Sequence, residues 1–170
     1  MMSRRNTLLG AGALGVTVAG VIAGVRGLFS ATPASADEPV RSYAVSHSSA
    51  EWQKALTAEQ FKVLRQAGTE RPGSSPLNQE KRAGVFTCAG CALPLFSSNT
   101  KFESGTGWPS FWQPIDQAVV EEIDTMLFMK RTEVLCRQCG GHLGHVFNDG
   151  PKPTGLRYCM NGVAMNFTAT

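Results

Sequence analysis

The chain has 170 residues, a length that suits one domain with an additional segment. Its formal net charge is +3, but three of the 16 Lys and Arg residues (Arg4, Arg5 and Arg26) lie before residue 37, and the 13 that remain equal the 13 Asp and Glu residues. A nucleic-acid-binding surface needs a basic footprint, so this balance predicts no nucleic-acid partner.

Residues 1–36 have the order of segments typical of an export signal. They contain no Asp or Glu, carry Arg4-Arg5 close to the start, continue as an apolar run and end in the small-residue pattern Ala34-Ser35-Ala36. A membrane-spanning anchor is the alternative, but it requires about 20 predominantly apolar residues. Glycines stud the run and Arg26 closes it, so we expect an export signal that contacts the membrane only transiently.

The paired arginines resemble the twin-arginine export signal. SRRNTLL at residues 3–9 follows the usual S-R-R-x-F-L-K pattern except at Thr7 and Leu9, which leaves the general secretory route open. The resemblance implies export in the folded state, to the periplasm or cell envelope of a bacterium. We expect three segments along the chain: an export signal over 1–36, a leader over 37–47 and a domain over 48–170.

Two short helices are predicted after the leader. Ser48-x-x-Glu51 and Thr57-x-x-Gln60 both have the spacing of a capping box, and each precedes an apolar-periodic stretch. Gly68 ends the second helix, and the Pro, Gly and Ser residues of 69–79 predict an extended loop.

From residue 84 onward the pattern predicts β-structure and no further helix. The strand candidates, separated by Gly and Pro turns, are 84–88, 118–123, 126–135, 143–147 and 162–168. The expected fold is therefore mainly β, with a short helical N-terminal arm on a small antiparallel core.

Four of the five cysteines form two C-x-x-C pairs, Cys88/Cys91 and Cys136/Cys139. Two such pairs supply the four thiolates of a tetrahedral Zn²⁺ site. Disulfides are the main alternative in an exported chain. However, each pair follows a strand candidate, whereas a redox C-x-x-C opens a helix. We therefore expect one structural zinc ion, with all four positions filled by protein.

The fifth cysteine, Cys159, has no partner of this kind. A lone cysteine is often a small buried apolar residue, but Arg157 and Asn161 stand two residues to either side and would share its face of a strand. A cation and an amide beside a thiol favour the nucleophilic thiolate. His142 and His145, which follow the second cysteine pair, are possible proton carriers, although metal binding is a competing interpretation.

The segment KFESGTGWPSFW over residues 101–112 places a large aromatic residue, Trp108, on a turn. Trp108 is either an ordinary core residue or an apolar wall for a small uncharged group. The pattern alone does not decide between these interpretations.

Five motifs together resemble the methionine-R-sulfoxide reductases, which act on the R epimer at sulfur. The motifs are CAGC (88–91), KFESGTGWPSF (101–111), RTEVLCRQC (131–139), HLGHVFNDGPKPTG (142–155) and RYCMN (157–161). They occur in order, within a resemblance that extends from about residue 49 to residue 167.

The resemblance implies a fold of two antiparallel β-sheets with a structural zinc remote from the active cysteine. It makes Cys159 the nucleophile toward methionine-R-sulfoxide in proteins or peptides, and it makes Trp108 the surface that packs on the substrate's S-methyl group. Around the nucleophile it places His142, His145, Asp149, Arg157 and Asn161. A sulfoxide oxygen leaves only when protonated, and the histidines are the expected donors.

Thr106 departs from the family pattern. Many members carry a second, resolving cysteine at this place in the loop, whereas here no cysteine remains for an internal disulfide with Cys159. The expected reductant is therefore external, either a thioredoxin-like domain or a small thiol. A second departure is Gly162, where serine is common.

Two other functions stay open from the sequence. One is a zinc-ribbon module that recognises a protein or a nucleic acid, which would need neither Cys159 nor the two histidines. The other is a thiol-disulfide oxidoreductase that uses a C-x-x-C pair, which tightly bound zinc on the four cysteines would exclude.

Overall fold

The structure, a computed structural model, describes residues 42–125 and 130–170. The expected export signal, the start of the leader and the first residues of the strand candidate 126–135 lie outside these ranges. None of the helices in the described part has the length and apolarity that crossing a membrane requires.

The helical arm consists of α1 (Ser49–Ala55) and α2 (Ala58–Gln66). Both predicted capping boxes are present: Glu51 N–H donates to Ser48 Oγ at 3.3 Å, and Ser48 N–H donates to the Glu51 carboxylate at 2.8 Å, with the same exchange between Thr57 and Gln60. The residue in the left-handed conformation at the end of α2 is Ala67, not Gly68. Gly68 follows it because a side chain there would meet the Lys62 carbonyl oxygen at 2.8 Å.

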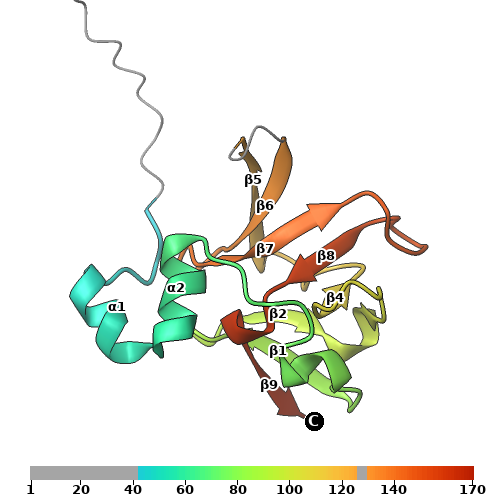
Figure 1. Ribbon diagram of the computed structural model, residues 1–170, viewed down its shortest axis with the longest axis horizontal. Coiled ribbons are helices and arrows are strands. Elements are labelled where there is room, and N and C mark those ends of the chain that lie inside the picture. Colours follow the sequence, from blue (N-terminus) through green and yellow to red (C-terminus); the bar gives the residue numbers. More distant parts are fainter. Residues whose placement is uncertain (1–41, 126–129) are drawn as a thin grey trace, which may run out of the picture. The chain divides into compact units, whose positions relative to one another are not determined.

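Nine strands in the described part of the chain form two antiparallel sheets, as expected (Figure 1). The smaller sheet has the order β2-β1-β9, and the larger has the order β3-β4-β8-β7-β6-β5. In chain order the strands are β1 (Gly84–Cys88), β2 (Pro94–Ser97), β3 (Lys101–Phe102), β4 (Ser110–Phe111), β5 (Val119–Asp124), β6 (Arg131–Cys136), β7 (His142–Phe147), β8 (Arg157–Met160) and β9 (Met165–Ala169). Three single 3₁₀ turns are also described: η1 (Pro76–Gln79), η2 (Ser98–Thr100) and η4 (Gly162–Ala164).

The strand predictions differ from the structure in two ways. The candidate 162–168 begins too early, because Gly162–Ala164 form the turn η4 and the strand starts only at Met165. Strands β2, β3 and β4 were not predicted. The last two have only two residues each, too few to show an alternating pattern. They are strands because β3 pairs with β4 and β4 pairs in turn with β8.

Three phenylalanines form the centre of the core. Phe96 of β2 stacks on Phe111 of β4 with ring centroids 4.3 Å apart, and Phe86 of β1 meets Phe111 edge-on at 4.9 Å. All three are fully buried, so the core joins strands of both sheets. Helix α2 packs against β7 and η4 through buried Val63 and Leu64 (Figure 1).

Candidate active site and metal centre

Cys159 lies on β8 and faces away from the core. Side chains alternate along this strand, so Tyr158 and Met160 are buried while Arg157 and Cys159 are half-buried on the opposite face. The register places Ser110 of β4 on one side of Cys159 and His145 of β7 on the other. The nucleophile candidate is thus held between two paired strands.

Cys159 lines a pocket of about 160 Å³. Of the residues expected around it, His145, Trp108 and Asn161 line the same pocket, whereas His142, Asp149 and Arg157 do not. The remaining lining residues are Thr69, Arg131, Gly144 and Phe147. The pocket therefore combines a thiol, an imidazole and an indole around a space suited to a small group.

Gly144 allows β7 and β8 to approach each other at this point. A Cβ atom at Gly144 would lie 2.2 Å from the carbonyl oxygen of Cys159, which is closer than any side chain tolerates. Gly144 was not among the site residues expected from the sequence. Its signal is a glycine inside a strand pattern, which often marks a close backbone approach.

His145 is oriented by an acidic residue that the sequence analysis missed. Its Nε2 atom lies 3.0 Å from the Asp124 carboxylate, and Arg131 Nη2 donates to the same oxygen at 2.6 Å. Burial lowers the pKa of His145, and the hydrogen bond with Asp124 opposes that shift only in part. Once protonated, this imidazole is a stronger acid than a free histidine.

His142 lies behind His145, with the ring centroids 5.4 Å apart. Its Nδ1 atom contacts the Glu133 carboxylate at 2.5 Å, and its Nε2 atom is buried without a hydrogen-bond partner among the described residues. Glu133 belongs to the RTEV motif, so the motif itself contained the signal for this partner. A buried nitrogen without a hydrogen-bond partner lowers the stability of the fold unless a water or a reacting group bonds to it.

Arg157 and Asp149 form a two-pronged ion pair beside the pocket. Arg157 Nε and Nη2 donate to the two Asp149 carboxylate oxygens at 2.8 and 2.9 Å, and the guanidinium lies 4.4 Å from the ring centroid of Phe147, a pocket residue. The hydrogen bond to Asp149 raises the pKa of Arg157, and the nearby Cys159 sulfur raises it further. The same hydrogen bond lowers the pKa of Asp149. The cation expected near the thiol is therefore present, fixed by a partner.

Asn161 has its side chain engaged by the backbone. Its Nδ2 atom donates to the Leu143 carbonyl at 3.1 Å, and its Oδ1 atom accepts from Glu70 N–H at 3.0 Å. Strand β8 ends at Met160, so the alternation that would place Asn161 beside the thiol does not extend to it. Asn161 thus connects three chain segments at the pocket.

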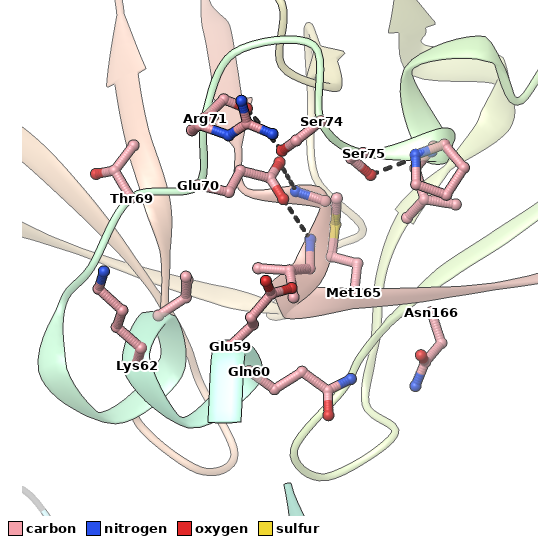
Figure 2. Close-up of a pocket in the computed structure, with 15 residues that line it drawn as sticks. Glu59, Gln60, Lys62, Thr69, Glu70, Arg71, Ser74, Ser75, Met165 and Asn166 are labelled. Carbon is pink, nitrogen blue, oxygen red and sulfur yellow. Dashed lines mark hydrogen bonds between the residues drawn. The ribbon is translucent and has the colours of Figure 1, made fainter. Parts of the chain in front are cut away.

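Glu70 holds Trp108 and the turn η4 in place, and Figure 2 shows the hydrogen bonds of its carboxylate. Its carbonyl oxygen accepts from Trp108 Nε1 at 3.2 Å, and its carboxylate accepts from Gly162 N–H at 2.6 Å and Val163 N–H at 3.0 Å. The carboxylate contacts lie on the wall of a second cavity of about 680 Å³, which shares Thr69 with the catalytic pocket. Glu70 is 91 residues from Asn161, and no local pattern marks it.

Gly162, the second departure from the family pattern, has a steric reason. A Cβ atom there would lie 2.0 Å from Ser75 Oγ and 2.5 Å from Ser75 Cβ. Ser75 is buried and its hydroxyl accepts from Leu77 N–H at 3.1 Å. A serine at position 162 therefore requires Ser75 to move.

The four remaining cysteines form one cluster that fits Zn²⁺. Their sulfurs all lie within 4.8 Å of one another, with Cys88–Cys139 at 3.7 Å and Cys91–Cys136 at 3.5 Å. A tetrahedron with Zn–S bonds of about 2.3 Å has edges of about 3.8 Å, whereas a disulfide has an S–S distance of about 2.05 Å. The sulfur positions match one zinc ion and exclude the disulfide alternative.

Arg65 of α2 supports the cluster from outside, although the sequence analysis did not identify it. Its Nη1 atom donates to the Cys139 carbonyl at 3.0 Å and its Nη2 atom to the Cys139 sulfur at 3.4 Å. The guanidinium also lies 4.3 Å from the ring centroid of Trp52 in α1. The helical arm therefore places a cation against a thiolate of the metal site.

Fold and site together define a thiol-based enzyme with a structural four-cysteine zinc site. The SelR domain family matches residues 56–169, and the chain belongs to this family. Proteins called peptide methionine sulfoxide reductase MsrB are similar over most of the chain. The one from Methanosarcina barkeri is 60% identical over 126 residues, which cover 73% of this chain and 88% of the relative.

Two further relatives carry the same name. The protein from Leptospira interrogans is 53% identical over 126 residues, covering 74% of this chain and 96% of the relative. That from Pseudomonas putida is 59% identical over 118 residues, covering 69% and 89%. The family resemblance drawn from the five motifs is confirmed.

Proposed function

We propose that the chain is a peptide-methionine (R)-S-oxide reductase, which converts the R epimer of methionine sulfoxide in oxidised proteins or peptides to methionine. The observation that carries this function is the pocket of about 160 Å³ in which Cys159, His145 and Trp108 meet. The thiol supplies the nucleophile, the imidazole a proton and the indole an apolar wall for the S-methyl group.

The first step needs no reactant other than the enzyme and the sulfoxide. The Cys159 thiol passes its proton to the histidine pair, and the thiolate attacks the sulfoxide sulfur. Oxygen then moves from the substrate sulfur to Cys159: the substrate S–O bond and the transient S–S bond to Cys159 break, a Cys159 S–O bond forms, and the proton returns to that oxygen. Methionine sulfur gains two electrons, Cys159 sulfur loses two, and the enzyme is left as a sulfenic acid.

The zinc ion takes no part in this step. Cys88, Cys91, Cys136 and Cys139 would fill all four positions of a tetrahedral zinc ion, and none of them lines the catalytic pocket. What the metal supplies is fixed geometry for the two turns that carry the cysteine pairs. This arrangement does not favour a C-x-x-C oxidoreductase, because both pairs are drawn into one cluster.

The sulfenic acid is reduced by a thiol from outside the chain. One external thiol condenses with it to a mixed disulfide and releases water, and a second thiol then frees Cys159 as the reagent becomes a disulfide. We propose a thioredoxin-like domain as the physiological donor, with a small thiol as the alternative. The supporting observation is that all four other cysteines lie in the metal cluster.

Turnover of epimerically pure substrates tests the activity. Zinc-loaded protein is incubated with R- or S-methionine sulfoxide peptide and dithiothreitol, and methionine is quantified. We expect turnover of the R epimer alone, and loss of that turnover in Cys159→Ser with zinc retained. Equal reduction of both epimers, or full activity of the variant, would contradict the proposal.

We also propose that residues 1–36 direct export to the bacterial periplasm, where the enzyme repairs proteins after oxidative stress. The support is the twin-arginine-like sequence with its following apolar run and small-residue cleavage pattern. Folded export also suits a domain that must acquire its metal. Fractionation and N-terminal sequencing test this proposal, with a mature chain that begins at Asp37 as the expected result and a cytoplasmic full-length chain as the contradiction.

A further inference from the structure

A chain of three hydroxyl groups leads from the interior of the domain to the sulfur of Cys159. Thr106 Oγ1 lies 3.8 Å from Cys159 Sγ and 2.8 Å from Ser104 Oγ, and Ser104 Oγ lies 2.7 Å from Ser110 Oγ. At the far end, Ser110 Oγ donates to the Trp108 carbonyl at 3.1 Å. The chain therefore joins the thiol to a backbone acceptor through an unbroken series of contacts.

The hydroxyl groups are held in place by the fold. Ser110 is fully buried and pairs with Cys159 across β4 and β8. The loop that carries Ser104 and Thr106 is fastened at Gly107, whose carbonyl accepts from Gly73 N–H at 2.7 Å and Asn78 Nδ2 at 3.0 Å. Gly107 has φ of 91°, and a Cβ there would meet Pro72 at 2.8 Å, so the loop has little freedom.

Each hydroxyl carries one proton, so the chain has two orientations. When Cys159 is a thiol, its S–H points to Thr106, and Thr106, Ser104 and Ser110 each donate one step further, ending at the Trp108 carbonyl. When Cys159 is a thiolate, the three hydroxyls can rotate together, so that Thr106 donates to the sulfur. No atom leaves its residue in this change.

We propose that this hydroxyl chain donates a hydrogen bond to Cys159 in its two reactive states, to the sulfur of the thiolate and to the oxygen of the sulfenic acid. Thr106 is then a further catalytic residue, and Ser104 and Ser110 are positioning residues. The role in the sulfenic acid rests on the proposed function. The 3.8 Å distance is long for such a bond, as is common in sites without substrate, where these contacts tighten on binding.

A hydrogen-bond donor at Cys159 is especially useful in a protein with one reactive thiol. The four other cysteines belong to the metal cluster, so no thiol of the described chain is available to consume the sulfenic acid. The intermediate must persist until an external thiol arrives. A hydrogen bond to its oxygen holds that oxygen in the pocket during the interval and disfavours further oxidation.

The test uses Thr106→Val, which keeps the shape of the side chain and removes the hydroxyl, with Thr106→Ser as the matched control. In zinc-loaded protein, alkylation of Cys159 by iodoacetamide at pH 7 is followed by mass spectrometry of its peptide. We expect about tenfold slower alkylation in Thr106→Val, the fold-change of one charge-assisted hydrogen bond, and a rate within about threefold of wild type in Thr106→Ser. Ser104→Ala, which removes the hydroxyl partner of Thr106, should be intermediate.

A second measurement follows the sulfenic acid after one turnover with R-methionine sulfoxide peptide. Dimedone added at increasing delays reports how much remains, and we expect it to be lost several times faster in Thr106→Val than in Thr106→Ser. Wild-type rates in Thr106→Val, or equal loss in both variants, would overturn the inference. Alkylation needs no sulfoxide, so it tests the hydroxyl chain independently of reductase activity. The inference about the hydroxyl chain can therefore be refuted while the proposed activity is upheld, and the proposed activity can be refuted while the inference is upheld.

Discussion

Replacement of Glu70 by glutamine tests whether the Glu70 carboxylate holds the turn η4 (Gly162–Ala164), as its hydrogen bonds indicate. The carboxylate of Glu70 accepts from two backbone N–H groups, those of Gly162 and Val163. A glutamine side chain has one acceptor oxygen, and its amide nitrogen would face the other N–H as a second donor. One charge-assisted bond becomes neutral and the other is replaced by a donor–donor contact.

The magnitude follows from these two changes. Hydrogen bonds to charged groups contribute about 1.5–3 kcal/mol, and neutral bonds about 0.5–1.5 kcal/mol. Water in the adjoining 680 Å³ cavity can hydrate the freed N–H and reduce the cost. We therefore expect Glu70→Gln to lower the free energy of unfolding by about 2 kcal/mol, and Glu70→Ala, which removes both acceptors, by about 3 kcal/mol.

Urea unfolding of zinc-loaded protein, extrapolated linearly to water, measures this loss. The matched control is Glu59→Gln, which removes an exposed carboxylate from the same cavity and should cost about 0.5 kcal/mol or less, the effect of an acid in the first turn of a helix. Trp108 Nε1 donates to the backbone carbonyl of residue 70, which Glu70→Gln keeps, so KM for the R-sulfoxide should stay close to the wild-type value. The reasoning is refuted if Glu70→Gln unfolds at the same urea concentration as Glu59→Gln.

Three further predictions address the metal, the nucleophile and pH. Chelation or Cys136→Ser should unfold the domain, since a four-thiolate zinc site contributes folding free energy of order 10 kcal/mol; a folded, active, metal-free sample in circular dichroism and activity assays would contradict this. Cys159→Ser should lose all turnover but keep its zinc content and unfolding midpoint, because a serine hydroxyl is scarcely ionised near neutral pH. Burial lowers the pKa of His145 below the ordinary histidine value of 6.5. As the pH falls below 6.5, the unfolded chain therefore binds a proton at this histidine before the folded chain does, and the free energy of unfolding decreases. Urea unfolding at pH 7.5 and 5.5 should therefore show a smaller pH difference for His145→Gln than for wild type, and an unchanged difference would argue against this.

Local patterns allowed part of the fold to be predicted. The capping boxes of α1 and α2 each involve residues three apart, so the sequence contains the complete motif. The same is true of the cysteine pairs, whose spacing fixes a turn around a metal. Strands β1, β5 and β7 were predicted to within one residue because each is long enough to show its character.

Contacts between distant segments could not be predicted in this way. Arg65 reaches Cys139 across 74 residues and Glu70 reaches Asn161 across 91, and neither residue has a neighbour that marks its role. Asn161 shows the limit of strand alternation as an argument. It lines the Cys159 pocket, but the alternation of β8 does not place it there, because β8 ends at Met160 and the chain turns into η4 immediately after Asn161.

The two cysteine pairs explain how a metal outside the pocket can still govern the site. Cys88 ends β1 of the smaller sheet and Cys136 ends β6 of the larger, so the four-cysteine cluster joins both sheets. Beyond Cys88, Ala89 N–H donates to the carbonyl of Ala164 in η4, the turn that Glu70 holds, and Cys139 stands three residues before His142. Loss of the metal would therefore displace both η4 and β7, the strand that carries His142 and His145. Activity should then be lost because these segments move, and not because the chemistry at Cys159 requires the metal.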